Sequence, residues 1–314
     1  MNDAHHDRRA ATAAGLVAVL LWSATIAVSR HLADEIGALT AAACTFLAAG
    51  VLGCAWAAAK GELARMVRLP PAYLAACGAC FVAYMICLYF AIGLAGTDQQ
   101  AIEVAVLNYL WPSLTLALSV LILHVKVRPA FWLGVVAALA GAALAPLRLE
   151  AYSAAALGRS LAANPLPYVL AAAAAVLWAL YSVLSRRLAG DAEGGAVPLF
   201  ALAAGVALAA LRPVLHEPTD WSLLAAGELA FMAIFPALIA YAFWDRAMRR
   251  GNATLVAAAS YGIPLVSTIL SSLYLGVALG PTLWVACGLV VAGAVVSSRS
   301  VRKESAECGM RNAE

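Results

Sequence analysis

The sequence predicts an all-α integral membrane protein with ten transmembrane helices, arranged as a 5+5 inverted-topology repeat. Three observations carry this prediction. The 314 residues are 64% hydrophobic and only 12% charged, with a mean hydropathy of +0.89, which is far too apolar for a water-soluble domain. Lysine and arginine gather in alternate connections, and several motifs recur at a nearly constant offset between the two halves of the chain.

Ten apolar runs are long enough to cross a hydrocarbon core of about 30 Å. They cover residues 12–29, 39–59, 73–94, 101–123, 131–147, 168–185, 197–215, 223–244, 253–277 and 283–298. Most connections between them are short. The exception lies in the middle of the chain, where residues 149–167 are expected to form a periplasmic linker.

Basic residues predict how the runs are oriented. Sixteen of the twenty lysines and arginines lie on the same side of the membrane as the N-terminus, and the exceptions are Arg30, Arg148, Arg159 and Arg212. Because basic loops stay in the cytoplasm, both termini are expected there. Residues 1–11 and 299–314 are then cytoplasmic tails of a multi-pass protein of the cell inner membrane.

Two stretches of the chain repeat in register. Leu21-Trp22 with Ser29-Arg30 recurs, at an offset of 156, as Leu177-Trp178 with Ser185-Arg186. An offset of 152 aligns Tyr109 with Tyr261 and Pro112 with Pro264. The predicted repeats are residues 12–148 and 168–298. Because each holds an odd number of spans, the second enters the membrane from the opposite side, as in secondary transporters whose solute site lies between the halves.

The fourth run carries polar groups that are costly inside a bilayer. At about 100° per residue, Gln100, Glu103, Trp111 and Thr115 share one face of a helix, with Asn108 at its margin. We therefore predict that this face lines a cavity. Glu103 is the ionisable candidate, either for binding a substrate ammonium group or for titrating with coupled protons. The alternative is a solvated carboxylate near the outer surface.

Two prolines are predicted to act as hinges. Pro112 and Pro264 lack the backbone N–H and disturb the carbonyls of Asn108 and Ser260, four residues earlier. Their matched positions suggest one hinge for each gate. The alternative is that both kinks only shape helix packing.

Deep aromatic residues complete the predicted site. Three tryptophans lie midway along their runs, where an indole is larger than packing alone requires: Trp22, Trp111 and Trp178. Tryptophans near span ends are instead expected to anchor the helices at the membrane interface. Indoles suit flat or cationic solutes. The predicted substrate-binding residues are Trp22, Tyr84, Glu103, Asn108, Trp111, Trp178, Tyr181 and Ser260.

Several classes of function are disfavoured. No hydrolase, metal-helix or phosphate-loop motif is present, so neither an enzyme, a metal site nor a cofactor is predicted. The basic residues are explained by the cytoplasmic ends of the spans and do not indicate nucleic-acid binding. The seven cysteines, all but Cys308 within apolar runs, indicate packing residues instead of disulfides. Gly134, Gly141, Gly288 and Gly293 are expected to permit close helix packing.

The segment Gln100–Thr115, QAIEVAVLNYLWPSLT, resembles the fourth helix of EamA-type exporters in the drug/metabolite transporter superfamily. Leu21-Trp22-Ser23, Tyr84 with Ile86-Cys87, and Trp178 with Tyr181 support the resemblance, which covers nearly all of the membrane region. It implies efflux of phenylalanine, tyrosine, tryptophan and related flat compounds by alternating access. Met85 departs from the family pattern, where an acid is expected, and leaves Glu103 as a more isolated carboxylate.

Other interpretations remain open at this point. One is a broad-specificity drug or metabolite exporter of the same superfamily. Others are an intramembrane enzyme and a non-transporting assembly protein. The sequence predicts no oligomeric state.

Overall fold

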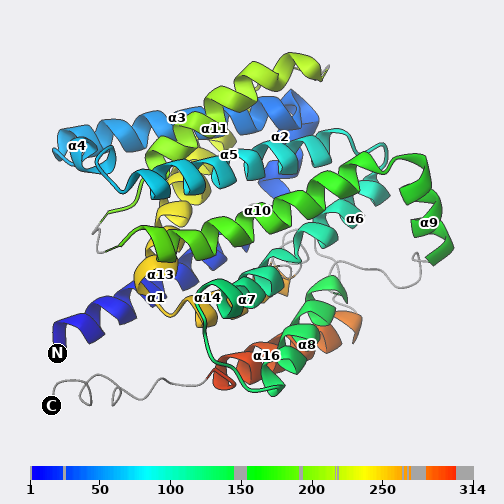
Figure 1. The fold of residues 1–314 in the computed structure, drawn as a ribbon. Coiled ribbons are helices and arrows are strands. Elements are labelled where there is room, and N and C mark those ends of the chain that lie inside the picture. The colour runs from blue at the N-terminus through cyan, green and yellow to red at the C-terminus, as the bar shows by residue number, and fades with distance from the viewer. Residues whose placement is uncertain are drawn as a thin grey trace, which may run out of the picture.

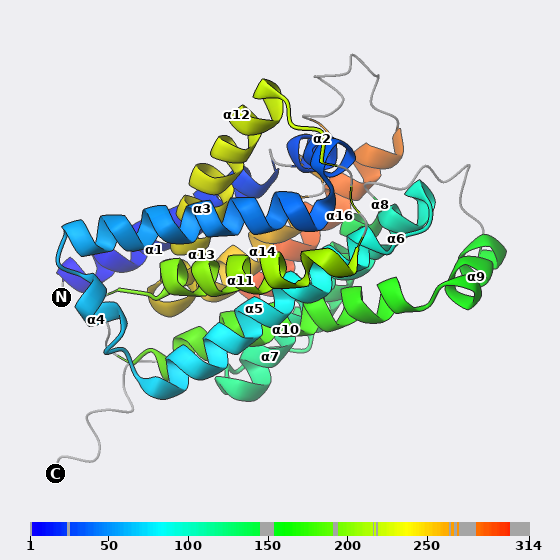
Figure 2. The same cartoon turned by 90° about the horizontal axis from the view of Figure 1, so that it is seen from above.

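A computed structural model describes residues 2–23, 26–144, 154–190, 194–215, 217, 219–263, 265–266, 269 and 281–301. Its long helices run roughly side by side (Figures 1 and 2). In both views the start of α1 (Asn2–Ser23) and α4 (Leu63–Met66) lie at one end of the bundle, and α9 (Ala154–Ala163) lies at the opposite end. The predicted all-helical architecture is confirmed for the described residues.

Helices form nearly all of the described chain. The remaining elements of the first half are α2 (Ile26–Ile36), α3 (Ala38–Ala59), α5 (Pro71–Gly93), α6 (Asp98–Asn108), α7 (Trp111–Ile122) and α8 (Ala130–Leu144). Those of the second half are α10 (Leu166–Leu188), α11 (Val197–Leu211), the 3-10 turn η2 (Arg212–Val214), α12 (Leu223–Met232), the π-helical η3 (Ala233–Ala240), α13 (Tyr241–Arg250), α14 (Ala253–Ala259), the 3-10 turn η4 (Ser260–Gly262) and α16 (Pro281–Arg299).

Five helical segments in the described chain are both long and apolar enough to cross a bilayer: α3, α5, α10, residues Val197–Val214, and residues Leu223–Arg250. Shorter apolar helices cover Trp111–Ile122, Ala130–Gly141, Ala253–Gly262 and Trp284–Ser297. Ten spans and their inverted 5+5 arrangement stay predictions.

The fourth predicted span is a broken helix instead of one kinked helix. The α6 helix ends at Asn108, and α7 begins at Trp111 with Pro112 in its first turn. Tyr109 and Leu110 between them form a turn, in which the Leu110 N–H donates to the Leu107 carbonyl at 3.1 Å. A proline is favoured in the first turn of a helix because its missing N–H is not needed there.

Small residues bring two helix pairs into backbone contact. A Cβ added to Gly50 of α3 would lie 2.4 Å from the Leu202 nitrogen of α11, and one added to Gly205 would lie 2.4 Å from the Leu47 nitrogen. Gly134, Gly141 and Gly293 pack α8 against α16 in the same way, as the sequence predicts. The prediction is wrong for Gly288, whose added Cβ would meet no atom within 4 Å.

A carboxylate from the second half caps α3. Gly37, which precedes this helix at φ 87°, has no side chain to offer as a cap. Glu217 instead accepts hydrogen bonds from the Leu39 and Thr40 nitrogens at 2.7 and 2.8 Å. An anion suits the first turn of a helix, where unpaired N–H groups and the helix dipole favour negative charge.

Candidate functional site

Eight aromatic side chains from both halves of the chain meet in the middle of the molecule. Trp178 of α10 is their centre, with ring centroids 4.9 Å from Tyr84, 5.7 Å from Trp22 and 6.1 Å from Trp111. We call this group the aromatic cluster. Its members are Trp22, Phe81, Tyr84, Trp111, Trp178, Tyr181, Tyr241 and Trp244.

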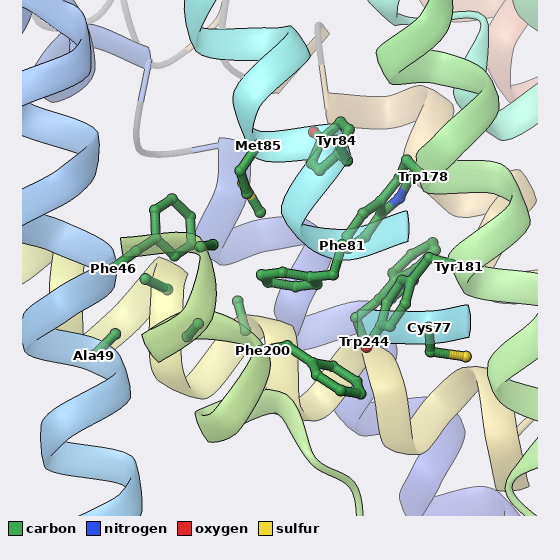
Figure 3. Packing of buried hydrophobic residues seen from close by; sticks show 14 of the residues in the cluster. Phe46, Ala49, Cys77, Phe81, Tyr84, Met85, Trp178, Tyr181, Phe200 and Trp244 are labelled. Carbon is green, nitrogen blue, oxygen red and sulfur yellow. The ribbon is translucent and has the colours of Figure 1, made fainter. Parts of the chain in front are cut away.

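Helical spacing places these rings. Phe81 and Tyr84, Trp178 and Tyr181, and Tyr241 and Trp244 are each three residues apart, so the members of each pair project from one face of their helix. Figure 3 shows Phe81 and Tyr84 of α5 beside Trp178 and Tyr181 of α10. Edge-to-face and tilted contacts of this kind contribute about 0.5–1.5 kcal/mol each beyond area burial.

Two indole N–H groups have partners that fix their orientation. Trp22 donates to the Pro236 carbonyl at 3.2 Å, within the π-helical segment. Trp244 donates to the Ser182 hydroxyl at 3.1 Å. Because a buried indole N–H without a partner is costly, these bonds favour one orientation of each ring.

Asn108, at the break between α6 and α7, has a side-chain oxygen in need of a donor. Its amide interacts with the Tyr84 hydroxyl, but its Oδ1 is buried without a hydrogen-bond partner, which holds for no other buried side-chain nitrogen or oxygen in the described chain. An orphaned buried acceptor costs about 1–3 kcal/mol. Its position beside Tyr84 offers a hydrogen bond to a donor that enters the aromatic cluster.

Not every predicted site residue belongs to this cluster. Glu103 is buried and hydrogen-bonds the Tyr168 hydroxyl near the start of α10. Tyr168 precedes Trp178 by ten residues, or about 15 Å of helix, so this carboxylate lies well away from the central indole. Ser260 is also buried, and its hydroxyl donates to the Ala257 carbonyl at 2.6 Å.

The two broken regions touch one another. The hydroxyls of Ser113, which follows Pro112, and Tyr261 of η4 are 2.5 Å apart. The α14 helix changes to a 3-10 turn at Ser260–Gly262, which lies 152 residues after Asn108–Leu110. Pro264 lies outside the described residues.

The walls of the predicted cavity contact one another in this structure. Trp178 is only 2% exposed and Trp111 only 5%, since each packs against other rings. A depression of about 460 Å³ does exist near the α3–α4 turn, lined by Ala58, Gly61, Leu63, Ala64 and Val67. It is remote from the indoles and has almost no polar group, so it does not suit an amino acid.

The sequence reasoning missed a polar cluster beside these rings. Asp245 of α13 is buried and accepts hydrogen bonds from Tyr73 of α5, Tyr181 of α10 and Arg249 of α13. Trp244, the residue before it, was also missed. The available signal was an acid that directly follows the predicted eighth span, next to an aromatic pair, Tyr241 and Trp244, with helical spacing.

Comparison with known proteins agrees with this architecture. A family model described as the EamA-like transporter family matches residues 10–146 and again residues 165–299. The aromatic amino acid exporter YddG of Ancylobacter novellus is 34% identical over 300 residues, covering 94% of this chain and 99% of the relative. YddG of Salmonella typhimurium is 31% identical over 293 residues, covering 93% of this chain and 98% of the relative.

Two further matches extend over similar lengths. YddG of Escherichia coli K12 is 29% identical over 296 residues, or 94% of this chain and 99% of the relative. One solved crystal structure has a TM-score of 0.78 and 32% identity, covering 94% of this chain and all of that one. These matches show a multi-pass membrane transporter and not an enzyme. The chain belongs to the EamA-like transporter family.

Proposed function

We propose that this transporter exports phenylalanine, tyrosine and tryptophan across the inner membrane by alternating access. The observation that carries the proposal is the aromatic cluster, which joins α1, α5 and α7 of the first half to α10 and α13 of the second. Relatives at about 30% identity are named aromatic amino acid exporters, which supports the same substrate class here.

The chemistry of the cluster suits an aromatic solute. When the halves separate, contacts among Trp22, Trp111 and Trp178 are replaced by contacts between these rings and the solute, at little net cost. The Asn108 oxygen accepts a hydrogen bond from the solute's ammonium group or indole N–H. A solute held by both halves is released to either side as they rock about it.

Helix pairing supports an inverted two-fold arrangement. The predicted equivalents α3 and α11 pack against each other, as do α8 and α16. The contact of α5 with α10 has its counterpart in that of α13 with α1. An axis in the membrane plane relates such pairs in transporters built from inverted repeats, with the solute site on that axis.

Counterflow tests the proposal. The purified protein is reconstituted in liposomes preloaded with unlabelled tryptophan, and uptake of labelled tryptophan or phenylalanine is measured against empty liposomes. Uptake above that background is expected, and its absence would remove aromatic amino acids as substrates. Competition with flat organic cations separates this function from a broad drug exporter, since only the latter would lose most of its counterflow to them.

A pair of tryptophan variants tests the site. Trp111→Ala is expected to lower counterflow about tenfold or more, because it removes a ring from the wall without removing a charge. Trp56→Ala is the matched control, since Trp56 is 67% exposed on α3 and has no ring contact with the cluster. Equal transport by both variants would remove Trp111 from the site.

Proton coupling is proposed for Glu103 and tested separately. If this carboxylate carries protons, a pH gradient should drive uptake, and Glu103→Gln should weaken that response while sparing counterflow. The buried bond between Glu103 and Tyr168 motivates the test, because losing a proton would change that bond and the packing of α6 on α10. Uptake that follows only the solute gradient would indicate a facilitator.

A further inference from the structure

The cluster of Asp245, Arg249, Tyr73 and Tyr181 lies directly against the aromatic cluster. Tyr181 belongs to both, since its ring lies 5.1 Å from that of Trp178 and its hydroxyl donates to Asp245 Oδ1 at 3.1 Å. Tyr73 donates to the same oxygen at 3.2 Å. The two tyrosines come from α5 and α10, so one carboxylate joins three helices at this level of the bundle.

A short backbone segment covers the carboxylate. The Ala196 N–H donates to the Tyr73 hydroxyl at 3.3 Å, and a Cβ added to Gly195 would lie 2.0 Å from Asp245 Oδ2. Asp245 is 1% exposed and the Arg249 side chain 5%. The segment before α11 therefore closes over the polar cluster and separates it from water.

The charges are distributed in a way that permits movement. Arg249 pairs with Asp245 Oδ2 at 2.8 Å, and both residues belong to α13 at i and i+4. A buried charge is costly when its partner is removed, but this pair travels with its own helix. The bonds that cross to α5 and α10 come from neutral hydroxyls. Moving α13 away from those helices thus breaks hydrogen bonds without leaving an unpaired charge.

We propose that Asp245, Arg249, Tyr73 and Tyr181 form a latch that holds the pathway shut at the end predicted to be cytoplasmic. The latch opens when both tyrosine hydroxyls leave Asp245 while the Asp245–Arg249 pair stays intact. The inference rests on the proposed transport function, since a latch needs a pathway to close. Its residues act as positioning residues for the gate. Tyr181 also has its ring in the aromatic cluster, but the latch uses only its hydroxyl, which bonds Asp245.

A native cysteine reports whether the latch is open. Cys77 is fully buried on α5, one helical turn after Tyr73, and Figure 3 shows it near Trp244 and Tyr181. A variant that keeps only this thiol has alanine at the other six cysteines, Cys44, Cys54, Cys80, Cys87, Cys287 and Cys308. A membrane-impermeant maleimide, applied to inside-out or right-side-out vesicles, then measures access to Cys77 from each side.

Removing the two hydroxyls should open the latch. Tyr73→Phe with Tyr181→Phe keeps both rings, so the variant should fold, whereas Asp245→Asn leaves Arg249 buried without its carboxylate. Labelling of Cys77 from the cytoplasmic side should be faster by about tenfold or more, since each hydroxyl bonds a charged acceptor. Labelling from the other side should not change. The matched control is Tyr89→Phe, which removes a hydroxyl from the same helix outside the latch.

Each outcome decides the proposal. An unchanged Cys77 rate in the double variant, or an equal increase from both sides or in Tyr89→Phe, would overturn the latch. Faster one-sided labelling together with no aromatic counterflow would support the latch and reject the substrate class. Counterflow of aromatic amino acids with an unaltered labelling rate would support the substrate class and reject the latch. The failures of the two proposals are therefore distinguishable.

Discussion

Asn108 illustrates how a residue that serves transport differs from one that serves stability. Its Oδ1 is buried without a partner while its amide interacts with the Tyr84 hydroxyl, so replacing the side chain removes one unfavourable and one favourable contribution, which offset one another. We predict that Asn108→Leu changes the free energy of unfolding by no more than about 1 kcal/mol and lowers counterflow of tryptophan about tenfold or more. Thermal unfolding in detergent and counterflow in liposomes measure the two effects.

A second asparagine provides the contrasting control. Asn252 caps α14 by accepting a hydrogen bond from the Leu255 nitrogen at 3.1 Å, outside the aromatic cluster. Asn252→Ala should lower the free energy of unfolding by about 1 kcal/mol and leave counterflow per folded protein unchanged. If Asn108→Leu transports normally, Asn108 is not a solute contact.

Helix packing gives opposite expectations for two glycine-to-alanine changes. Gly50→Ala places a methyl group 2.4 Å from the backbone of α11, so α3 and α11 must move apart and the unfolding midpoint should fall. Gly227→Ala in α12 meets no atom within 4 Å and should raise stability by up to about 1 kcal/mol through helix propensity. Shifts of the same sign in both variants would contradict the close approach of α3 and α11.

A histidine bond between α2 and α12 predicts a pH dependence of stability. His31 Nδ1 lies 2.7 Å from Glu228 Oε2, and its Nε2 lies 3.4 Å from Glu35. The hydrogen bond to Glu228 raises the pKa of His31 above its usual 6.5, with support from the charges of Glu35 and Asp34. Its stabilisation is therefore fully present below pH 6.5 and is lost as the pH rises through the raised pKa.

The measurement compares unfolding midpoints at about pH 5.5 and about pH 8.5. The unfolding midpoint of the wild-type protein should fall more between these two pH values than that of His31→Gln, because glutamine cannot become charged. The difference should be small, because the His31 side chain is 39% exposed and water screens the interaction. Parallel pH profiles for the two proteins would show that His31 does not contribute to this attachment.

The two ends of the molecule are predicted to face opposite sides of the membrane. The α3–α4 turn and the α9 helix lie at opposite ends of the bundle (Figures 1 and 2). In a background without native cysteines, Glu62→Cys and Arg159→Cys place exposed thiols at these two ends. An impermeant maleimide added to intact cells should label the α9 variant and should label the α4 variant only after permeabilisation. The reverse pattern would place the termini outside the cytoplasm.

Much of the architecture was predictable from local features of the chain. A bilayer requires each spanning backbone to satisfy its own hydrogen bonds, so long apolar runs predict helices without knowledge of their neighbours. The deep tryptophans were recognisable for a similar reason, because an indole midway along an apolar run stands out from the small residues around it. The helix break at Pro112 also follows from one residue, although its form as two separate helices does not.

Contacts between distant parts of the chain were decided by tertiary packing. Glu217 caps a helix that begins 179 residues earlier, at Ala38, and Asp245 meets Tyr73 across 172 residues. Neither pairing has a signature in the local sequence. An acid inside or beside an apolar run indicates only an unfavourable desolvation energy and does not reveal which distant group compensates it. The composition thus established that this chain belongs in a membrane. Only the three-dimensional arrangement established which polar groups pair with one another there, because those pairs form between helices that folding brings together.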